Sequence, residues 1–109
     1  MYNINQWVIH GFEWDHHNWP KCASHGVSQA EIEWVFEHEP AVMPDPNPLE
    51  LRARAIGRTQ AGRHVFVAFT TRKYGDKSLI RPISARYMHI REVRHYEKFR
   101  DGKTDEESH

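Results

Sequence analysis

Arginine side chains recur at positions where a strand would present them together. From Arg52 to Arg58 every second residue is Arg or Ile, and the residues between them are Ala or Gly. Successive side chains of a strand point to opposite faces, so this stretch predicts a basic outer face and a small-residue face against a helix. Each guanidinium can donate two hydrogen bonds to one phosphate, which indicates binding to a nucleic-acid backbone. The residues predicted to bind RNA are Arg52, Arg54, Arg58, Arg72, Lys73 and Lys77.

A second candidate set lies near the C-terminus, where His89, Glu92 and Tyr96 are spaced three and four residues apart. On a helix this spacing places the three side chains on one face. Beside arginines they could cleave RNA without a metal: a base for the 2′-hydroxyl, cations for the phosphorane, and an acid for the leaving 5′-oxygen. The alternative is a surface pair of Glu92 with His89 and a Tyr96 that packs in the core. Spacing alone favours this alternative.

The nine histidines and the single cysteine do not form a metal-binding pattern. The sequence has no H-E-x-x-H or C-x-x-C motif, so we expect neither a metal nor another cofactor. Histidine is better suited here to general acid or base catalysis near neutral pH. His25 precedes Gly26 and could cap a helix, pack, or reach a pocket at a sheet edge. Serine-hydrolase and phosphate-loop motifs are also absent from the sequence.

Charge is divided unevenly along the chain, although the formal net charge is +0. The first fifty residues carry eight carboxylates against Lys21 alone, whereas fourteen of the fifteen Lys and Arg residues lie between positions 51 and 103. A basic region attracts a polyanion, with RNA the first candidate, DNA the second and an acidic protein the third. A solvated sheet face is the alternative, but such faces usually mix charges of both signs.

With 109 residues the chain is long enough for one domain and one core. Cys22 has no second cysteine to pair with, which favours a reduced, cytoplasmic protein. The longest apolar run, 65–69, is far shorter than the roughly 18 residues of a membrane span, and the N-terminus does not resemble a signal peptide. We expect a single domain over 1–103 and an acidic, disordered tail over 104–109.

The hydrophobic pattern predicts an α+β fold with helices on one face of a small antiparallel sheet. Ser28 and Glu31 form a capping box that begins a helix, and Pro40 ends it. The prolines at 44, 46 and 48 predict a rigid, extended connector. The other expected elements are a strand over 8–14, a helix over 16–24, a three-strand meander over 51–58, 63–72 and 78–86, and a helix over 89–100 that buries Ile90 and Val93.

Pro82 interrupts the third strand of the expected meander. Proline cannot donate a hydrogen bond to a neighbouring strand, so we expect a bulge or a sheet edge there. Strict alternation would put Arg81 and Arg86 on opposite faces. A bulge of one residue would bring both arginines to the same face.

Several short motifs are separated along the chain. In order, they are F-E-W-D at 12–15, Asn18 with Lys21, H-G-V-S at 25–28, V-F-E at 35–37, I-G-R-T and A-G-R between 56 and 63, I-R-P-I-S-A-R at 80–86, and R-E-x-x-x-Y at 91–96. This ordered set resembles the BrnT family of type II toxins. The resemblance implies a RelE-like fold and a ribonuclease that inhibits translation. It also implies a BrnA-like ribbon-helix-helix antitoxin as partner, with operator DNA contacted only through that antitoxin and no membrane.

The resulting hypothesis is a metal-independent endoribonuclease. Arg63, Arg81 and Arg86 would hold the scissile phosphate, and His25 or Tyr96 would transfer the proton; these five are the predicted catalytic residues. The competing hypothesis is a non-catalytic module that docks an antitoxin or nucleic acid through its basic sheet. Both hypotheses require a polyanion, and only the first requires cleavage.

Overall fold

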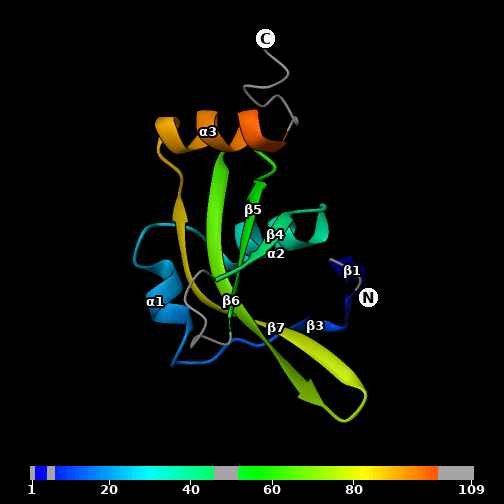
Figure 1. The fold of residues 1–109 in the computed structure, drawn as a ribbon. Coiled ribbons are helices and arrows are strands. Elements are labelled where there is room, and N and C mark those ends of the chain that lie inside the picture. The colour runs from blue at the N-terminus through cyan, green and yellow to red at the C-terminus, as the bar shows by residue number, and fades with distance from the viewer. Residues whose placement is uncertain (1, 5–6, 46–51, 101–109) are drawn as a thin grey trace.

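The computed structural model describes residues 2–4, 7–45 and 52–100. A five-stranded sheet has the order β3-β7-β6-β5-β4, and a separate antiparallel hairpin pairs β1 with β2. Two helices lie on one side of the large sheet, and the third crosses one end of it (Figure 1). The elements are β1 (Tyr2–Ile4), β2 (Trp7–Ile9), β3 (Gly11–Phe12), α1 (Trp19–Ala23), α2 (Gln29–Glu37), β4 (Ala41–Pro44), β5 (Ala53–Arg58), β6 (His64–Tyr74), β7 (Lys77–Tyr87) and α3 (Ile90–Arg100).

The predicted α+β class, with two N-terminal helices and one C-terminal helix, is confirmed. The prediction of a purely antiparallel sheet is wrong, because β3 runs parallel to β7 with Gly11 opposite Leu79. In the sequence, β4, β5 and β6 lie between these two strands, so the chain can return to β7 in the same direction as β3. The expected connector is in part an edge strand, since β4 pairs with β5. Its Pro44 lies at the strand end, where a missing amide hydrogen costs little. The predicted acidic tail at 104–109 lies outside the described residues.

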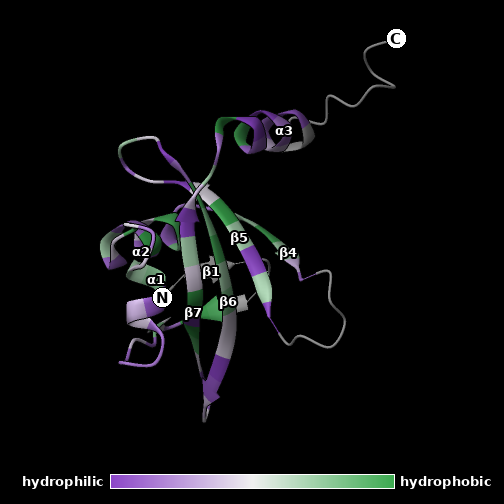
Figure 2. Cartoon of the chain, turned by 90° about the vertical axis from the view of Figure 1, so that its left-hand side faces the viewer, coloured by the Kyte–Doolittle hydropathy of each residue, from purple (hydrophilic) through white to green (hydrophobic). Residues whose placement is uncertain are grey.

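The core lies between one face of the sheet and helices α1 and α2 (Figure 2). On β6 the residues Val65, Val67 and Phe69 are fully buried. They pack with buried side chains of α2, among them Ile32 and Phe36. The intervening residues of β5, β6 and β7 point to the opposite side, which we call the open face. No helix within the described residues is both long and apolar enough to cross a bilayer.

The capping box at the start of α2 forms as predicted. The Ser28 hydroxyl accepts from the amide of Glu31 at 3.1 Å, and the Glu31 carboxylate accepts from the amide of Ser28 at 2.9 Å. This cap fixes the first turn of α2 and thereby the direction in which its apolar side meets β5. The small-residue face predicted for β5 is the face that meets this helix, because a Cβ at Gly57 would lie 2.8 Å from Val35 Cγ1.

Gly57→Ala is therefore expected to destabilise the protein by about 1–3 kcal/mol, because the added methyl group forces α2 away from β5. Chemical denaturation of the variant and wild type measures the difference. Gly62→Ala tests backbone strain instead of packing. The φ of 90° at this position is unfavourable for alanine, and no atom lies within 4 Å of the added Cβ. Equal stability of Gly57→Ala and wild type would contradict the close packing.

The bulge predicted at Pro82 is present. Ala68 lies opposite Ser84 and Phe69 lies opposite Pro82, so Ile83 is the extra residue. The shift places Arg81, opposite Thr70, and Arg86, opposite Phe66, on the open face. Buried Asn18 stabilises this irregularity by donating to the Pro82 carbonyl at 2.8 Å and to the Glu13 carbonyl at 3.0 Å.

The terminal helices differ in detail from the prediction. Helix α1 is shorter than expected, because Pro20 fits only in its first turn. In α3 the expected burial of Ile90 is wrong: 55% of this residue is exposed, and Val93 is half-buried. The cause is the position of α3, which crosses the end of the sheet instead of packing along it (Figure 1).

Candidate active site between the open face and helix α3

A cavity of about 530 Å³ lies where α3 crosses the open face. The sheet contributes Arg54, Ile56 and Phe66 from β5 and β6, and Met43 from β4. The rest of the lining is Met88, Arg91, Glu92, His95 and Tyr96. The cavity thus combines cations, an imidazole and a phenol above an apolar floor.

Two arginines flank the aromatic floor of this cavity. The guanidinium carbon of Arg86 lies 4.8 Å from the centre of the Phe66 ring, and that of Arg54 lies 5.6 Å from it. Such contacts between a cation and an aromatic face hold the guanidinium plane without consuming its donors. Arg54 and Arg86 can therefore approach one phosphate from two strands.

Glu92 holds Arg86 in place. Its two carboxylate oxygens accept from the two terminal nitrogens of Arg86 at 2.7 and 2.8 Å, and one of them also accepts from the amide of His89 at 2.9 Å. The hydrogen bonds from Arg86 and then from that amide lower the pKa of Glu92 to about 2. A carboxylate of this kind is a weak base at neutral pH, so Glu92 positions Arg86 rather than removing a proton.

His95 and Tyr96 supply the groups in the cavity that can exchange protons. Tyr96 packs edge-on against His64 of β6, with 5.9 Å between the ring centres. His95 is exposed on α3 and faces the same cavity. His95 and Arg91 were not predicted as site residues from the sequence, although their spacing of four residues places both on one side of a helix. In the expected pair of His89 with Glu92, the hydrogen bond comes from the His89 backbone amide.

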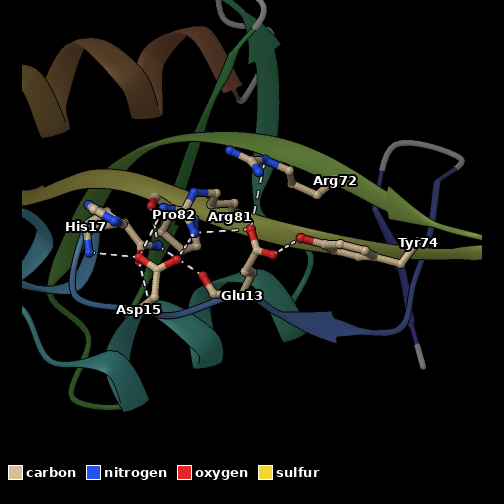
Figure 3. Close-up of polar contacts among 8 residues, drawn as sticks. Glu13, Asp15, His17, Arg72, Tyr74, Arg81 and Pro82 are labelled. Atoms are coloured by element: carbon tan, nitrogen blue, oxygen red, sulfur yellow. Dashed lines mark hydrogen bonds and ion pairs between the residues drawn. The ribbon is translucent and has the colours of Figure 1, made fainter.

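Arg81 lies on the open face but in a different environment (Figure 3). It donates to Asp15 at 2.9 and 3.1 Å and to Glu13 at 3.1 Å, and only 12% of its side chain is exposed. Glu13 also accepts from Tyr74 and forms an ion pair with Arg72. The donors of Arg81 are thus directed at two carboxylates of the loop before α1, which favours a structural role.

Arg63 and His25 lie on the other side of the sheet. The guanidinium carbon of Arg63 is 3.4 Å from the centre of the Tyr87 ring, and Tyr87 opposes the core residue Val65. The Tyr87 hydroxyl donates to Glu31. It also contacts the carbonyl of Gly26, the residue after His25. The structure thus brings together Arg86 and Tyr96 near one cavity, while Arg63 contacts Tyr87 and His25 precedes the Gly26 carbonyl that Tyr87 also contacts.

The residues predicted to bind RNA are distributed over the open face and its margins. Arg52 forms an ion pair with Asp45 at 2.9 Å, and Arg58 lines a second, smaller cavity. Arg72, Lys73 and Lys77 are exposed near the turn between β6 and β7, which extends away from the body of the protein (Figure 1). Within the described residues no group of three His, Cys, Asp or Glu side chains could hold a metal ion.

The chain matches a protein-family model over most of its length. The family model described as ribonuclease toxin, BrnT, of type II toxin-antitoxin system covers residues 14–92. The chain belongs to the BrnT family. No curated protein and no solved structure matches the chain significantly. The protein is accordingly a ribonuclease toxin of a type II toxin–antitoxin system, which implies an RNA substrate and a cognate antitoxin.

The family match covers some residues of the candidate site and not others. It includes strands β4 to β7 of the sheet, with Arg81, Arg86 and Glu92, and it ends before His95 and Tyr96. The arginine and carboxylate that support the cavity therefore belong to the segment shared with the BrnT family. The two groups that can exchange protons rest on the geometry of α3 in this chain.

The ion pairs of this BrnT toxin predict a loss of stability in acid. Arg81, together with the His17 amide, holds the pKa of Asp15 well below its usual range, and Arg86 lowers that of Glu92 to about 2. The unfolded carboxylates bind protons more tightly, so this stabilisation is present above about pH 4 and disappears as the pH falls toward 2.

The measurement is the thermal unfolding midpoint of wild type, Asp15→Asn and Glu92→Gln between pH 7 and pH 2.5. Each variant is expected to be less stable than wild type at pH 7 and to lose less stability in acid. The comparison between variants removes the contribution of the histidines, which all three proteins share. Parallel curves for the three proteins would contradict the linkage.

Proposed function

We propose that this BrnT toxin is a metal-independent endoribonuclease of RelE-like fold whose active site is the cavity between the open face and α3. The observation that carries the proposal is the arrangement of Arg54 and Arg86 around Phe66, beside a cavity lined by His95 and Tyr96. Arginines and proton-exchanging groups in one place are what phosphodiester cleavage needs when no metal supplies the charge.

In the proposed reaction the 2′-hydroxyl of RNA attacks the adjacent phosphorus. His95 accepts the hydroxyl proton, the bond from phosphorus to the 5′-oxygen breaks, and Tyr96 donates a proton to that oxygen. The products are a 2′,3′-cyclic phosphate and a free 5′-hydroxyl. Arg86 and Arg54 stabilise the additional negative charge of the phosphorane, and Glu92 holds Arg86 in the required orientation.

Three other residues predicted to be catalytic, His25, Arg63 and Arg81, do not line the proposed active site. The contacts of Arg81 with two carboxylates, and of Arg63 with Tyr87, favour roles in holding the loop before α1 and the end of the sheet. A catalytic role of His25, Arg63 or Arg81 remains a prediction from the sequence. The proposal extends to the cell: cleavage of cytoplasmic RNA inhibits translation, and a BrnA-like ribbon-helix-helix antitoxin neutralises the toxin and contacts operator DNA.

Purified toxin is expected to cleave single-stranded RNA in EDTA and to leave 2′,3′-cyclic phosphate ends. His95→Ala and Tyr96→Phe should each slow cleavage by about 100-fold, the usual range for loss of one acid or base. Activity lost in EDTA and restored by Mg²⁺ would contradict the metal-independent mechanism. RNA binding without cleavage would identify the competing function, a binding module that uses the same basic face.

A further inference from the structure

A second cavity adjoins the proposed active site. Its volume is about 280 Å³, and Ile56 and Tyr96 line both cavities. Because the phenol of Tyr96 belongs to both, a chain that enters the first cavity at its reacting phosphate can continue into the second. The second cavity extends from α3 past the end of β5 to the C-terminal end of α2.

Two aromatic rings at the C-terminal end of α2 are stacked on each other in this second cavity: Trp34 lies in the helix and His38 is its C-cap residue. The rings of Trp34 and His38 have centres 3.8 Å apart and planes inclined by only 16°. His38 Nδ1 lies 2.7 Å from the carbonyl oxygen of Trp34, and because a carbonyl oxygen only accepts, this nitrogen carries the hydrogen. The bond fixes the imidazole parallel to the indole, so the pair is a flat surface of fixed orientation.

The stacked pair does not belong to the core. The buried residues of α2 are Ile32, Val35 and Phe36, whereas Trp34 is half-buried and His38 is exposed. Nearby, Arg58 is exposed at the end of β5, and Glu39 follows the last turn of α2. The cavity thus offers a flat aromatic surface, a guanidinium and a carboxylate. These groups suit a nucleobase, a phosphate and the N–H groups of a base edge, respectively.

We propose that this cavity binds one nucleotide of single-stranded RNA adjacent to the scissile phosphate. The base stacks on the Trp34–His38 pair, the phosphate binds Arg58, and Glu39 accepts from the base edge. The inference rests on the proposed function, because it places the nucleotide next to the site of cleavage. Such a subsite would increase the affinity of the toxin for RNA with little dependence on base sequence, since every base offers an aromatic face for stacking.

The test measures binding separately from catalysis. The ligands are 2′-O-methyl oligonucleotides of seven residues, which lack the attacking hydroxyl, and each has one position replaced by an abasic residue. Their affinities are measured by fluorescence anisotropy for wild type, His38→Ala, His38→Phe and the matched control His16→Ala. His16 is also an exposed histidine in contact with a neighbouring ring, that of His17 at 4.0 Å between centres, but the two planes are inclined by 40° and it lies in the loop before α1.

For wild type, one abasic position should weaken binding by about fivefold or more, the effect expected for loss of one stacked base. His38→Ala should weaken binding of the intact oligonucleotide by a similar factor. In this variant, the oligonucleotide with that abasic position should bind as tightly as the intact one. His38→Phe keeps a flat ring but loses the hydrogen bond to the Trp34 carbonyl, so it should bind more tightly than His38→Ala and retain the effect of the abasic position. His16→Ala should behave like wild type. The inference would be overturned if the abasic position lowered affinity by the same factor in wild type and in His38→Ala. It would also be overturned if His38→Phe bound the intact oligonucleotide as weakly as His38→Ala.

Arg58→Gln gives an independent measurement of the phosphate contact. It should lower the log–log salt slope of binding by about 0.7, the value for one phosphate contact on a single strand. An unchanged slope would remove Arg58 from the subsite. Failure of the proposed function has a different signature: wild-type toxin would not cleave unmodified RNA, or Arg86→Ala would cleave it normally, while the binding comparison would stand.

Discussion

Replacement of Arg86 by alanine is expected to reduce RNA cleavage by about 100-fold or more and to relieve toxicity in cells. Glu92 and the Phe66 ring hold the guanidinium beside the cavity, so the N–H donors that Glu92 does not occupy are preorganised for the phosphorane charge. Loss of one such contact in the transition state typically costs about 3 kcal/mol of barrier. Stability should fall much less, by about 1 kcal/mol, because 41% of the Arg86 side chain is exposed to water.

Single-turnover cleavage of an RNA oligonucleotide, together with thermal unfolding, separates these two effects. Arg94→Ala is the control, since Arg94 is an exposed arginine of the neighbouring helix α3 and does not line the cavity. Glu92→Gln should slow cleavage less than Arg86→Ala, because Arg86 stays in place but loses its ionic partner. An Arg86→Ala protein that cleaves at the wild-type rate would remove this arginine from the mechanism. One that unfolds would show that the ion pair with Glu92 is structural.

Arg81→Ala is expected to have the opposite result, a large loss of stability with little loss of activity per folded molecule. The substitution removes three hydrogen bonds to Glu13 and Asp15 and leaves two carboxylates facing each other without a cation between them. Charge-assisted hydrogen bonds of a mostly buried arginine contribute substantially to stability. For a protein of this size we expect the thermal unfolding midpoint to fall by about 10 °C.

The control for Arg81 is Arg72→Ala. Arg72 also approaches Glu13, but at 3.9 Å and with 53% of its side chain exposed, so its removal should change the midpoint little. Cleavage is measured at a temperature where all three proteins are folded. A stable but inactive Arg81→Ala protein would support the prediction from the sequence that Arg81 binds the scissile phosphate.

Together, Arg86→Ala and Arg81→Ala test whether the two ends of the open face have different roles, one in catalysis and one in stability. Near α3, arginines border a cavity with an imidazole and a phenol, and a carboxylate orients one of them. Near α1, Glu13 and Asp15 bind Arg81 and fasten the loop before the helix to the bulge of β7 (Figure 3). The acidic N-terminal half thus neutralises one part of the basic half. We propose that the part beside α3 stays available to RNA.

The sequence alone was sufficient for features that depend on neighbouring residues. The capping box of Ser28 and Glu31 and the alternation of β5 both form as predicted. So does the bulge at Pro82. In each case the deciding physics is local: a side chain bonds an amide three residues away, a strand alternates its side chains, and a proline lacks an amide hydrogen. The ordered motifs were also enough to indicate the BrnT family, which the match over residues 14–92 confirms.

Only the tertiary structure decided which charged residues meet. Arg81 and Arg86 carry the same side chain on the same face, yet one binds Asp15 across 66 positions of sequence and the other binds Glu92 six positions away. The parallel pairing of β3 with β7 brings the acidic loop to Arg81, and the crossing of α3 over the sheet end brings His95 to the cavity. Electrostatic and hydrogen-bond energies depend on distances of a few ångström. Such distances between remote segments are set by the packed fold and are not encoded in any local pattern of residues.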